Sequence, residues 1–151
     1  MIRIDHLNIV VSDIERSVRF YTAVLGLRRG FEKLLEGEWV ETVTGLPGAR
    51  AACVFMETGE PGTRIELLQY FSPEGEALPL ASLPNTGGVR HFGFMVDGAT
   101  FAALPDRLRA AGMRVFSEPV EVPFAVGTLG KKRLYYFLDP DGVILEAATY
   151  E

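Results

Sequence analysis

Cysteine and histidine are scarce in this sequence, and long apolar runs are absent from it. Among 151 residues there is one cysteine, Cys53, and there are two histidines, His6 and His91. A lone cysteine cannot build the internal disulfide framework of a small secreted protein. No apolar run approaches the roughly 20 residues that a helix needs to cross a bilayer, and the N-terminus enters a strand pattern without the apolar segment of a signal peptide. These absences predict a cytoplasmic protein with no membrane partner.

Clustered positive charge is also nearly absent. The chain has 15 Lys and Arg against 20 Asp and Glu, a formal net charge of −5. Its one basic cluster, Lys131-Lys132-Arg133, is more typical of a solvated strand start than of an anion site. A nucleic-acid partner needs a basic surface and is therefore not expected. With 48% hydrophobic residues the chain can build a core, so we expect a compact protein whose partner is a small molecule.

The sequence contains one repeated pattern, in which a histidine opens a strand-like stretch and a glutamate lies in a later apolar run. His6 and His91 each open a strand-like stretch, in Ile-Asp-His-Leu-Asn and in Val-Arg-His-Phe-Gly. Glu66 and Glu146 each lie in an apolar run with a tyrosine four residues further on. The two halves of the chain thus start and finish with the same residue patterns, which indicates an internal duplication.

Each half of the duplication has the pattern strand, helix, strand, strand, strand. Alternating apolar residues predict strands at 3–11, 27–36, 51–57, 63–70, 89–97, 113–118, 131–138 and 143–150. The segment around Trp39 is ambiguous, and residues 119–130 are expected to be flexible. The fold class is therefore α+β, with two modules that share a joined sheet. Residues 1–151 would form one domain, with a first module at 1–70, a linker at 71–88 and a second module at 89–151.

Local signals predict where the helices and one turn lie. Ser12 and Glu15 have the spacing of a capping box, so the first helix should start there and end at Gly26. Gly112 should end the second helix, whose main part we place at 105–111 because an interior proline at Pro105 would be costly. Asp139-Pro-Asp-Gly142 favours a β-turn over a calcium loop, since it lacks the further acidic ligands.

The alternation also predicts which way the ionisable side chains face. Each of His6, Glu66, His91 and Glu146 is out of phase with the aliphatic residues of its strand, so it should face away from the core. A carboxylate inside an apolar strand needs solvent, a counter-charge or a metal. Two imidazoles and two carboxylates suit one divalent ion such as Zn, Ni, Co, Fe or Mn. Cys53, between Ala52 and Val54, is expected to be packed rather than nucleophilic.

The residues that carry these signals also resemble a known family. The stretch from His6 to Gly26, the phrase Arg64-Ile-Glu-Leu-Leu, the His91 strand, and Asp139-Pro-Asp-Gly-Val-Ile-Leu-Glu146 together resemble the vicinal oxygen chelate superfamily. That family includes glyoxalase I, methylmalonyl-CoA epimerase, extradiol dioxygenases and fosfomycin- and bleomycin-resistance proteins. The resemblance covers nearly the whole chain.

The resemblance implies a fold, a metal site and an assembly. It implies two βαβββ modules that form an eight-stranded, cup-shaped sheet, the glyoxalase/bleomycin-resistance/dihydroxybiphenyl dioxygenase fold, with a metal in the cup and often a homodimer. By matching motif positions, the metal ligands are His6, Glu66, His91 and Glu146. The family's substrates chelate the metal through adjacent oxygens.

Three functions stay open at this point. The first is a metal-dependent lyase or isomerase of the glyoxalase I or methylmalonyl-CoA epimerase type, which moves a proton alpha to a metal-bound carbonyl through an enediolate, with Glu146 or Glu66 as the base. The second is an Fe(II) extradiol-type dioxygenase, although a fourth protein ligand at Glu66 weighs against it. The third is a small-molecule binding or resistance protein, for which an intact ligand set would be unnecessary.

Overall fold

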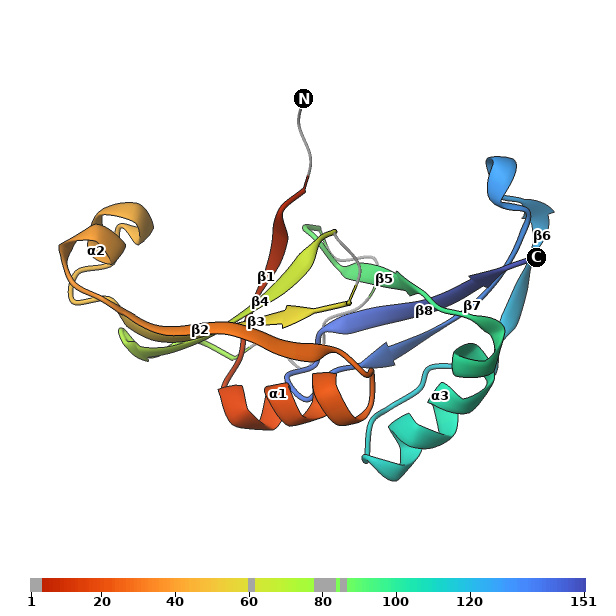
Figure 1. The fold of residues 1–151 in the computed structure, drawn as a ribbon, viewed down its shortest axis with the longest axis horizontal. Coiled ribbons are helices and arrows are strands. Elements are labelled where there is room, and N and C mark those ends of the chain that lie inside the picture. The colour runs from red at the N-terminus through yellow and green to blue at the C-terminus, as the bar shows by residue number, and fades with distance from the viewer. Residues whose placement is uncertain (1–3, 60–61, 78–83, 85–86) are drawn as a thin grey trace. The chain divides into compact units, whose positions relative to one another are not determined.

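The structure is a computed structural model that describes residues 4–59, 62–77, 84 and 87–151. The chain divides into two compact units, Met1–Ala77 and Leu78–Glu151. Three parts of the predictions lie outside the described residues: residue 3 of the first strand, residues 60–61 of the turn at 59–62, and residues 78–83 and 85–86 of the linker. Figure 1 shows the order of the elements.

The first unit is a four-stranded sheet with a helix on one face. Its elements are β1 (His6–Val10), α1 (Ile14–Ala23), β2 (Arg28–Glu36), α2 (Glu38–Thr44), β3 (Arg50–Glu57) and β4 (Arg64–Ser72). The strand order is β1-β4-β3-β2, with β1 parallel to β4 and the other pairs antiparallel. Helix α1 packs against β2, β3 and β4. The ambiguous segment around Trp39 is the short helix α2, inserted between β2 and β3.

The second unit repeats this plan. Its elements are β5 (His91–Met95), α3 (Gly98–Ala110), β6 (Val120–Ala125), the 3₁₀ turn η1 (Gly127–Leu129), β7 (Lys131–Leu138) and β8 (Ile144–Tyr150). The strand order is β5-β8-β7-β6, and β5 is again parallel to β8. The predicted α+β class and its repeated strand–helix–strand–strand–strand module are therefore confirmed. No helix among the described residues is both long enough and apolar enough to cross a membrane.

Helix α1 starts one residue later than predicted. The capping residue is Asp13, whose carboxylate accepts a hydrogen bond from the backbone N–H of Arg16 over 2.9 Å. The predicted capping box of Ser12 with Glu15 is therefore wrong. Serine and aspartate can both cap a helix, but the carboxylate of Asp13 also complements the positive end of the helix dipole. The other end is as predicted, because Gly26 has a φ of 76°, a left-handed conformation that suits glycine.

Helix α3 runs without interruption through Pro105, and the predicted start of its main part at 105 is wrong. A proline cannot donate a hydrogen bond to the carbonyl four residues earlier, which here belongs to Phe101. The buried hydroxyl of Tyr135, on β7, donates to that carbonyl over 3.1 Å. A side chain from the sheet thus replaces the missing bond of the helix, which the local sequence could not show.

The strand predicted at 113–118 is also wrong. Only Val115 makes a bridge to β7, opposite Phe137, and the strand proper is β6, inside the segment expected to be flexible. Pro123 lies inside β6, but β6 is the edge strand of its sheet, where proline is tolerated.

The turn before β8 is confirmed. The N–H of Gly142 donates to the carbonyl of Asp139 over 3.1 Å, as in a β-turn. The side chain of Asp139 accepts further bonds from the N–H groups of Asp141 and Val143. These bonds fix the point from which β8 carries Glu146 into the sheet.

Candidate metal-binding half-sites

The first unit brings His6 and Glu66 together. Strands β1 and β4 are parallel with Asn8 opposite Glu66, so His6 lies two residues before that position on the same face. Nε2 of His6 is 3.5 Å from Oε2 of Glu66, and the two side chains are 39% and 17% exposed. Ile65 and Leu67, on either side of Glu66, are buried. The predicted orientation of this pair, away from the core, is confirmed.

The second unit repeats the arrangement with His91 and Glu146. Strands β5 and β8 are parallel with Gly93 opposite Glu146, so His91 again precedes the position by two residues. Nε2 of His91 is 3.6 Å from Oε2 of Glu146. Here the glutamate is only 8% exposed, and every residue of β8 except Tyr150 is buried. The duplication in the sequence is thus a duplication of one His–Glu pair, and we call each of the pairs His6–Glu66 and His91–Glu146 a half-site.

An aromatic ring supports each imidazole from the neighbouring antiparallel strand. Phe55 lies opposite Glu66 and its ring centroid is 5.6 Å from that of His6. Tyr136 lies opposite Glu146 and its ring centroid is 4.8 Å from that of His91. The two rings hold corresponding positions on β3 and β7, and each limits how far its imidazole can turn.

Asp5 fixes the orientation of His6. Its Oδ2 lies 2.9 Å from Nδ1 of His6 and 2.6 Å from the Arg64 guanidinium. The hydrogen bond from His6, followed by the one from Arg64, lowers the pKa of Asp5. An ionised carboxylate can only accept a hydrogen bond, so Nδ1 carries the proton and Nε2 offers its lone pair toward Glu66. Histidine ligands of metals are commonly held in this way.

Glu66 is held by weak and neutral donors. Its Oε2 accepts a hydrogen bond from Nδ2 of Asn8 over 3.1 Å, and its Oε1 contacts Sγ of Cys53 at 3.6 Å. Cys53 is 3% exposed. Burial, followed by the charge of Glu66, raises the pKa of Cys53 to about 12. The thiol therefore stays protonated near neutral pH, as expected of a packed cysteine rather than a nucleophile.

Glu146, in contrast, has a charged partner. Nζ of Lys132 lies 2.6 Å from Oε1 of Glu146, and the lysine side chain is 19% exposed. Burial alone would lower the pKa of Lys132, but the hydrogen bond and charge of Glu146 outweigh it and the pKa is raised. The interpretation of the basic cluster as a solvated strand start suits Lys131, which is exposed and pairs with Glu121 at 3.3 Å, but it is wrong for Lys132.

Lys132 was not predicted as a neighbour of Glu146, although the sequence carries a signal for this position. Lys132 is in phase with Tyr136 on β7, and Tyr136 lies opposite Glu146. Once β7 and β8 are paired, the lysine must share a face with the glutamate. The pairing register, which no local pattern gives, was the missing information.

Each His–Glu pair has the chemistry and spacing to bind a divalent ion. Ligand atoms about 2.1 Å from one ion lie roughly 3.0 Å apart at a right angle and about 3.4 Å apart at the tetrahedral angle. The distances of 3.5 Å and 3.6 Å between nitrogen and oxygen are close to the second value. Within the described residues no cluster of three or more His, Cys, Asp or Glu side chains is arranged to hold a metal. Each unit therefore offers two ligands.

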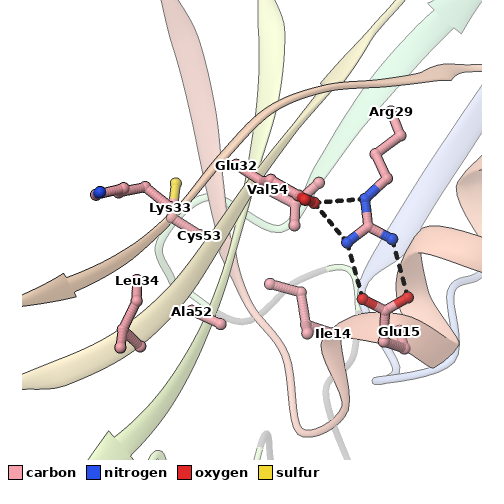
Figure 2. A pocket seen from close by; sticks show the side chains of 9 residues that line it. All are labelled: Ile14, Glu15, Arg29, Glu32, Lys33, Leu34, Ala52, Cys53 and Val54. Atoms are coloured by element: carbon pink, nitrogen blue, oxygen red, sulfur yellow. Dashed lines mark hydrogen bonds and ion pairs between the residues drawn. The ribbon is translucent and has the colours of Figure 1, made fainter.

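A pocket of about 400 Å³ lies elsewhere in the first unit, between α1, β2 and β3. Figure 2 shows the guanidinium group of Arg29 between the carboxylates of Glu15 and Glu32, with bonds of 2.7–3.0 Å. The hydrogen bonds that Arg29 donates to Glu15 and Glu32 raise the pKa of Arg29. These three side chains satisfy one another, whereas Lys33, which also lines the pocket, is exposed and has no ion pair with a described residue.

Comparison with known proteins places the chain in a family. The model of the Glyoxalase/Bleomycin resistance protein/Dioxygenase superfamily matches residues 3–147. The chain is 27% identical over 148 residues to a 2-epi-5-epi-valiolone epimerase from Actinomyces, covering 96% of this chain and 78% of that one. It is 28% identical over 148 residues to the human mitochondrial methylmalonyl-CoA epimerase, covering 95% and 72%. A crystal structure of a glyoxalase family protein from Bacillus cereus matches with a TM-score of 0.86 and 25% identity, covering 99% and 95%. The chain belongs to the Glyoxalase/Bleomycin resistance protein/Dioxygenase superfamily.

Proposed function

We propose that His6, Glu66, His91 and Glu146 together bind one divalent ion, with Zn, Ni, Co, Fe and Mn as the candidates. The observation that carries the proposal is the repeated pair, in which a histidine Nε2 faces a glutamate Oε2 at 3.5 Å in one unit and at 3.6 Å in the other. Neutral imidazole and carboxylate are ligands that these metals share. The hydrogen bond between Asp5 and His6 supports the proposal because it presents the Nε2 lone pair.

We further propose that the protein is a metal-dependent isomerase or lyase that moves a proton on the carbon next to a substrate carbonyl. A bound divalent ion supplies Lewis-acid polarisation of that carbonyl. The chain supplies the proton acceptor, and Glu66 and Glu146 are the two carboxylates in the half-sites. Both matched relatives described above are named epimerases, and reversible removal of such a proton is one route to epimerisation.

The substrate is proposed to be a small molecule with adjacent oxygens that can chelate the ion. An ion held by these four side chains would have room for two such oxygens if it took up six ligands when the substrate binds. The Fe(II) dioxygenase alternative needs only two histidines and one carboxylate. The second carboxylate, present in the same geometry as the first, favours proton transfer over oxygen activation.

Hydrogen exchange tests this function without knowledge of the natural substrate. The metal-loaded protein is incubated in D₂O with a panel of thiol adducts of 2-oxo-aldehydes and of 2-methyl-branched acyl thioesters. We expect deuterium to enter the carbon next to the carbonyl in at least one compound, and not with the apoprotein. A loaded protein that exchanges none of them, but consumes oxygen with a catechol when Fe(II) is bound, would contradict the proposal.

A further inference from the structure

Lys33, on β2, is the one lysine that has no ion pair among the residues that the structure describes. The chain has three lysines. Lys131 pairs with Glu121 at 3.3 Å, and Lys132 pairs with Glu146 at 2.6 Å. The side chain of Lys33 is exposed and its charge is balanced by no described carboxylate. This ammonium group is therefore available to a ligand.

The other charged side chains of β2 are all paired. The pairs are Arg28 with Glu57, Arg29 with Glu15 and Glu32, and Glu36 with Arg50. Lys33 lies in the middle of the same strand, next to one of these acids in the sequence. Its lack of a partner is thus an exception on a strand that otherwise neutralises its charges.

Lys33 lies on the same face of the first sheet as Glu66. In the pairing of β2 with β3, Lys33 is opposite Cys53, and residues directly opposite each other in an antiparallel pair point to one face. Sγ of Cys53 contacts Oε1 of Glu66 at 3.6 Å. Figure 2 shows the side chains of Lys33 and Cys53 on one side of the two strands, and those of Leu34 and Ala52 on the other. A ligand bound at Glu66 can therefore reach Lys33 along the surface of the sheet.

Aromatic side chains lie between the half-site of the first unit and β2. The ring centroid of Phe55 is 5.6 Å from that of His6, and the ring centroid of Phe31 is 6.3 Å from that of Phe55. Phe31 is 60% exposed and precedes Lys33 by two residues on β2. A ligand that extends from the half-site toward Lys33 thus lies on an apolar surface.

The cation nearest to the half-site of the first unit is already committed. The guanidinium group of Arg64 lies 2.6 Å from Oδ2 of Asp5 and is stacked over the ring of Phe55, at 4.5 Å from its centroid. A ligand would have to displace both contacts to use it. Lys33 requires no such exchange.

The pairing of the strands gives the length of the ligand that would reach both positions. Cys53 lies opposite Lys33 on one side and opposite Leu68 on the other, and Leu68 follows Glu66 by two residues. Lys33 is therefore two strands across and two residues along from Glu66. With strands about 4.8 Å apart and a rise of about 3.3 Å per residue, the two Cα atoms are about 12 Å apart.

We propose that Lys33 is a specificity-determining residue that binds a carboxylate at the far end of the substrate, and this inference rests on the proposed function. The substrate is then an acid with chelating oxygens at one end, an apolar middle part that lies on Phe31 and Phe55, and a carboxylate at the other end. One ammonium group matches the single charge of a carboxylate better than the charge of a phosphate group, which is about −1.5 to −2. Lys33 takes no part in proton transfer.

The first test compares two hydroxamates, which chelate a metal through adjacent oxygens. Suberic monohydroxamate carries a carboxylate after six methylene groups, and octanohydroxamate has the same number of carbons but ends in a methyl group. The dissociation constant of each from the Co²⁺-loaded protein is measured by the change in Co²⁺ absorption at low salt. We call the constant for octanohydroxamate divided by that for suberic monohydroxamate the carboxylate preference.

We expect Lys33→Met to lower the carboxylate preference by about 2- to 5-fold, which is the range for an ion pair at an exposed position. Lys33→Arg keeps the charge and should keep the preference. Salt at 0.5 M should remove most of the difference between Lys33→Met and the unchanged protein, because exposed charges are screened. Circular dichroism shows whether each variant is folded, and Lys33→Gln replaces Lys33→Met if that variant is not.

Lys131→Met is the matched control, because it removes the same charge from an exposed lysine that pairs with Glu121 instead. An unchanged carboxylate preference in Lys33→Met, or an equal fall in Lys131→Met, would overturn the role of Lys33 and leave the metal site standing. If neither hydroxamate binds to the unchanged Co²⁺-loaded protein, the proposed function fails and the inference fails with it.

The second test uses the unchanged protein. Brief acetylation with an amine-reactive ester, followed by peptide mass spectrometry, gives a separate rate for each of the three lysines. Saturating suberic monohydroxamate, with Co²⁺ bound, should slow the acetylation of Lys33 relative to saturating octanohydroxamate and leave that of Lys131 unchanged. Equal rates at Lys33 with the two compounds would overturn the proposed contact.

Discussion

Oδ2 of Asp5 lies 2.9 Å from Nδ1 of His6, and the ionised carboxylate therefore sets which nitrogen of the imidazole is free. No corresponding acid precedes His91, where the neighbouring residue is Arg90. The two histidines thus have the same place in the repeat but different support.

Asp5→Asn should weaken metal binding. An amide can donate as well as accept, so it no longer forces the proton onto Nδ1 of His6. The expected loss is about tenfold or more in affinity, as for other residues that orient a metal-binding histidine. Chelator competition measures it. Asp106→Asn is the matched control, because Asp106 is exposed and pairs with Arg109, away from both histidines in the sequence; an equal loss in both variants would contradict the role given to Asp5.

Stability should depend on Asp5 in acid. Its pKa is lowered in the folded protein, so the stabilisation is present above the ordinary aspartate pKa and is lost as the pH falls through the folded value. The free energy of unfolding is measured by urea titration between neutral pH and pH 3, for the unchanged protein and for Asp5→Asn. The difference between them should shrink as the pH falls, and a constant difference would contradict this linkage.

The bond from Tyr135 to the Phe101 carbonyl should be coupled to Pro105. Tyr135→Phe leaves that buried carbonyl without a donor, which costs about 1–3 kcal/mol. In a Pro105→Ala background the backbone N–H of residue 105 can bond to the same carbonyl, so the same substitution should cost less. A double-mutant cycle from urea unfolding measures the coupling. Equal costs in both backgrounds would show that the hydroxyl does not replace the helix bond.

Cys53 should be unreactive in the folded protein. Its thiol is buried and its pKa is raised to about 12, so almost no thiolate is present at pH 8. A disulfide reagent should label it slowly without denaturant and at once in urea. Cys53→Ala is the blank, because the chain has no other cysteine. Rapid labelling of the folded protein would contradict the packed position assigned to this residue.

The repeated module and its metal-ligand candidates could be predicted from the sequence because they rest on periodicity. Alternation placed His6 and Glu66 on the face away from buried neighbours such as Ile9 and Leu67, and the structure agrees. The duplication paired each histidine with a glutamate. These features are local or repeated, so a single sequence contains them.

The features that were missed depend on pairing between segments. Lys132 belongs to the half-site only because β7 lies beside β8 in a particular register. Pro105 is tolerated in α3 because a tyrosine on another strand reaches Phe101. Strand β6 contains Pro123, which is acceptable only at the edge of a sheet. Local propensity carries none of this information.

Assembly is a further prediction. Proteins of the superfamily that the sequence resembles often form dimers, and we expect this chain to be a homodimer. Sedimentation velocity at micromolar concentration, with and without added Co²⁺, measures the assembled mass. A monomer under both conditions would contradict the prediction.

The central claim is that two repeated His–Glu pairs bind a single ion, and metal stoichiometry tests it most directly. Protein purified without a metal-affinity tag should contain close to one divalent ion per chain by elemental analysis. His6→Ala and His91→Ala, one from each unit, should each lose most of that ion while remaining folded, because the cores lie on the other faces of the strands. If both variants keep full occupancy, or if each loses only half of two bound ions, the pairs do not form one site.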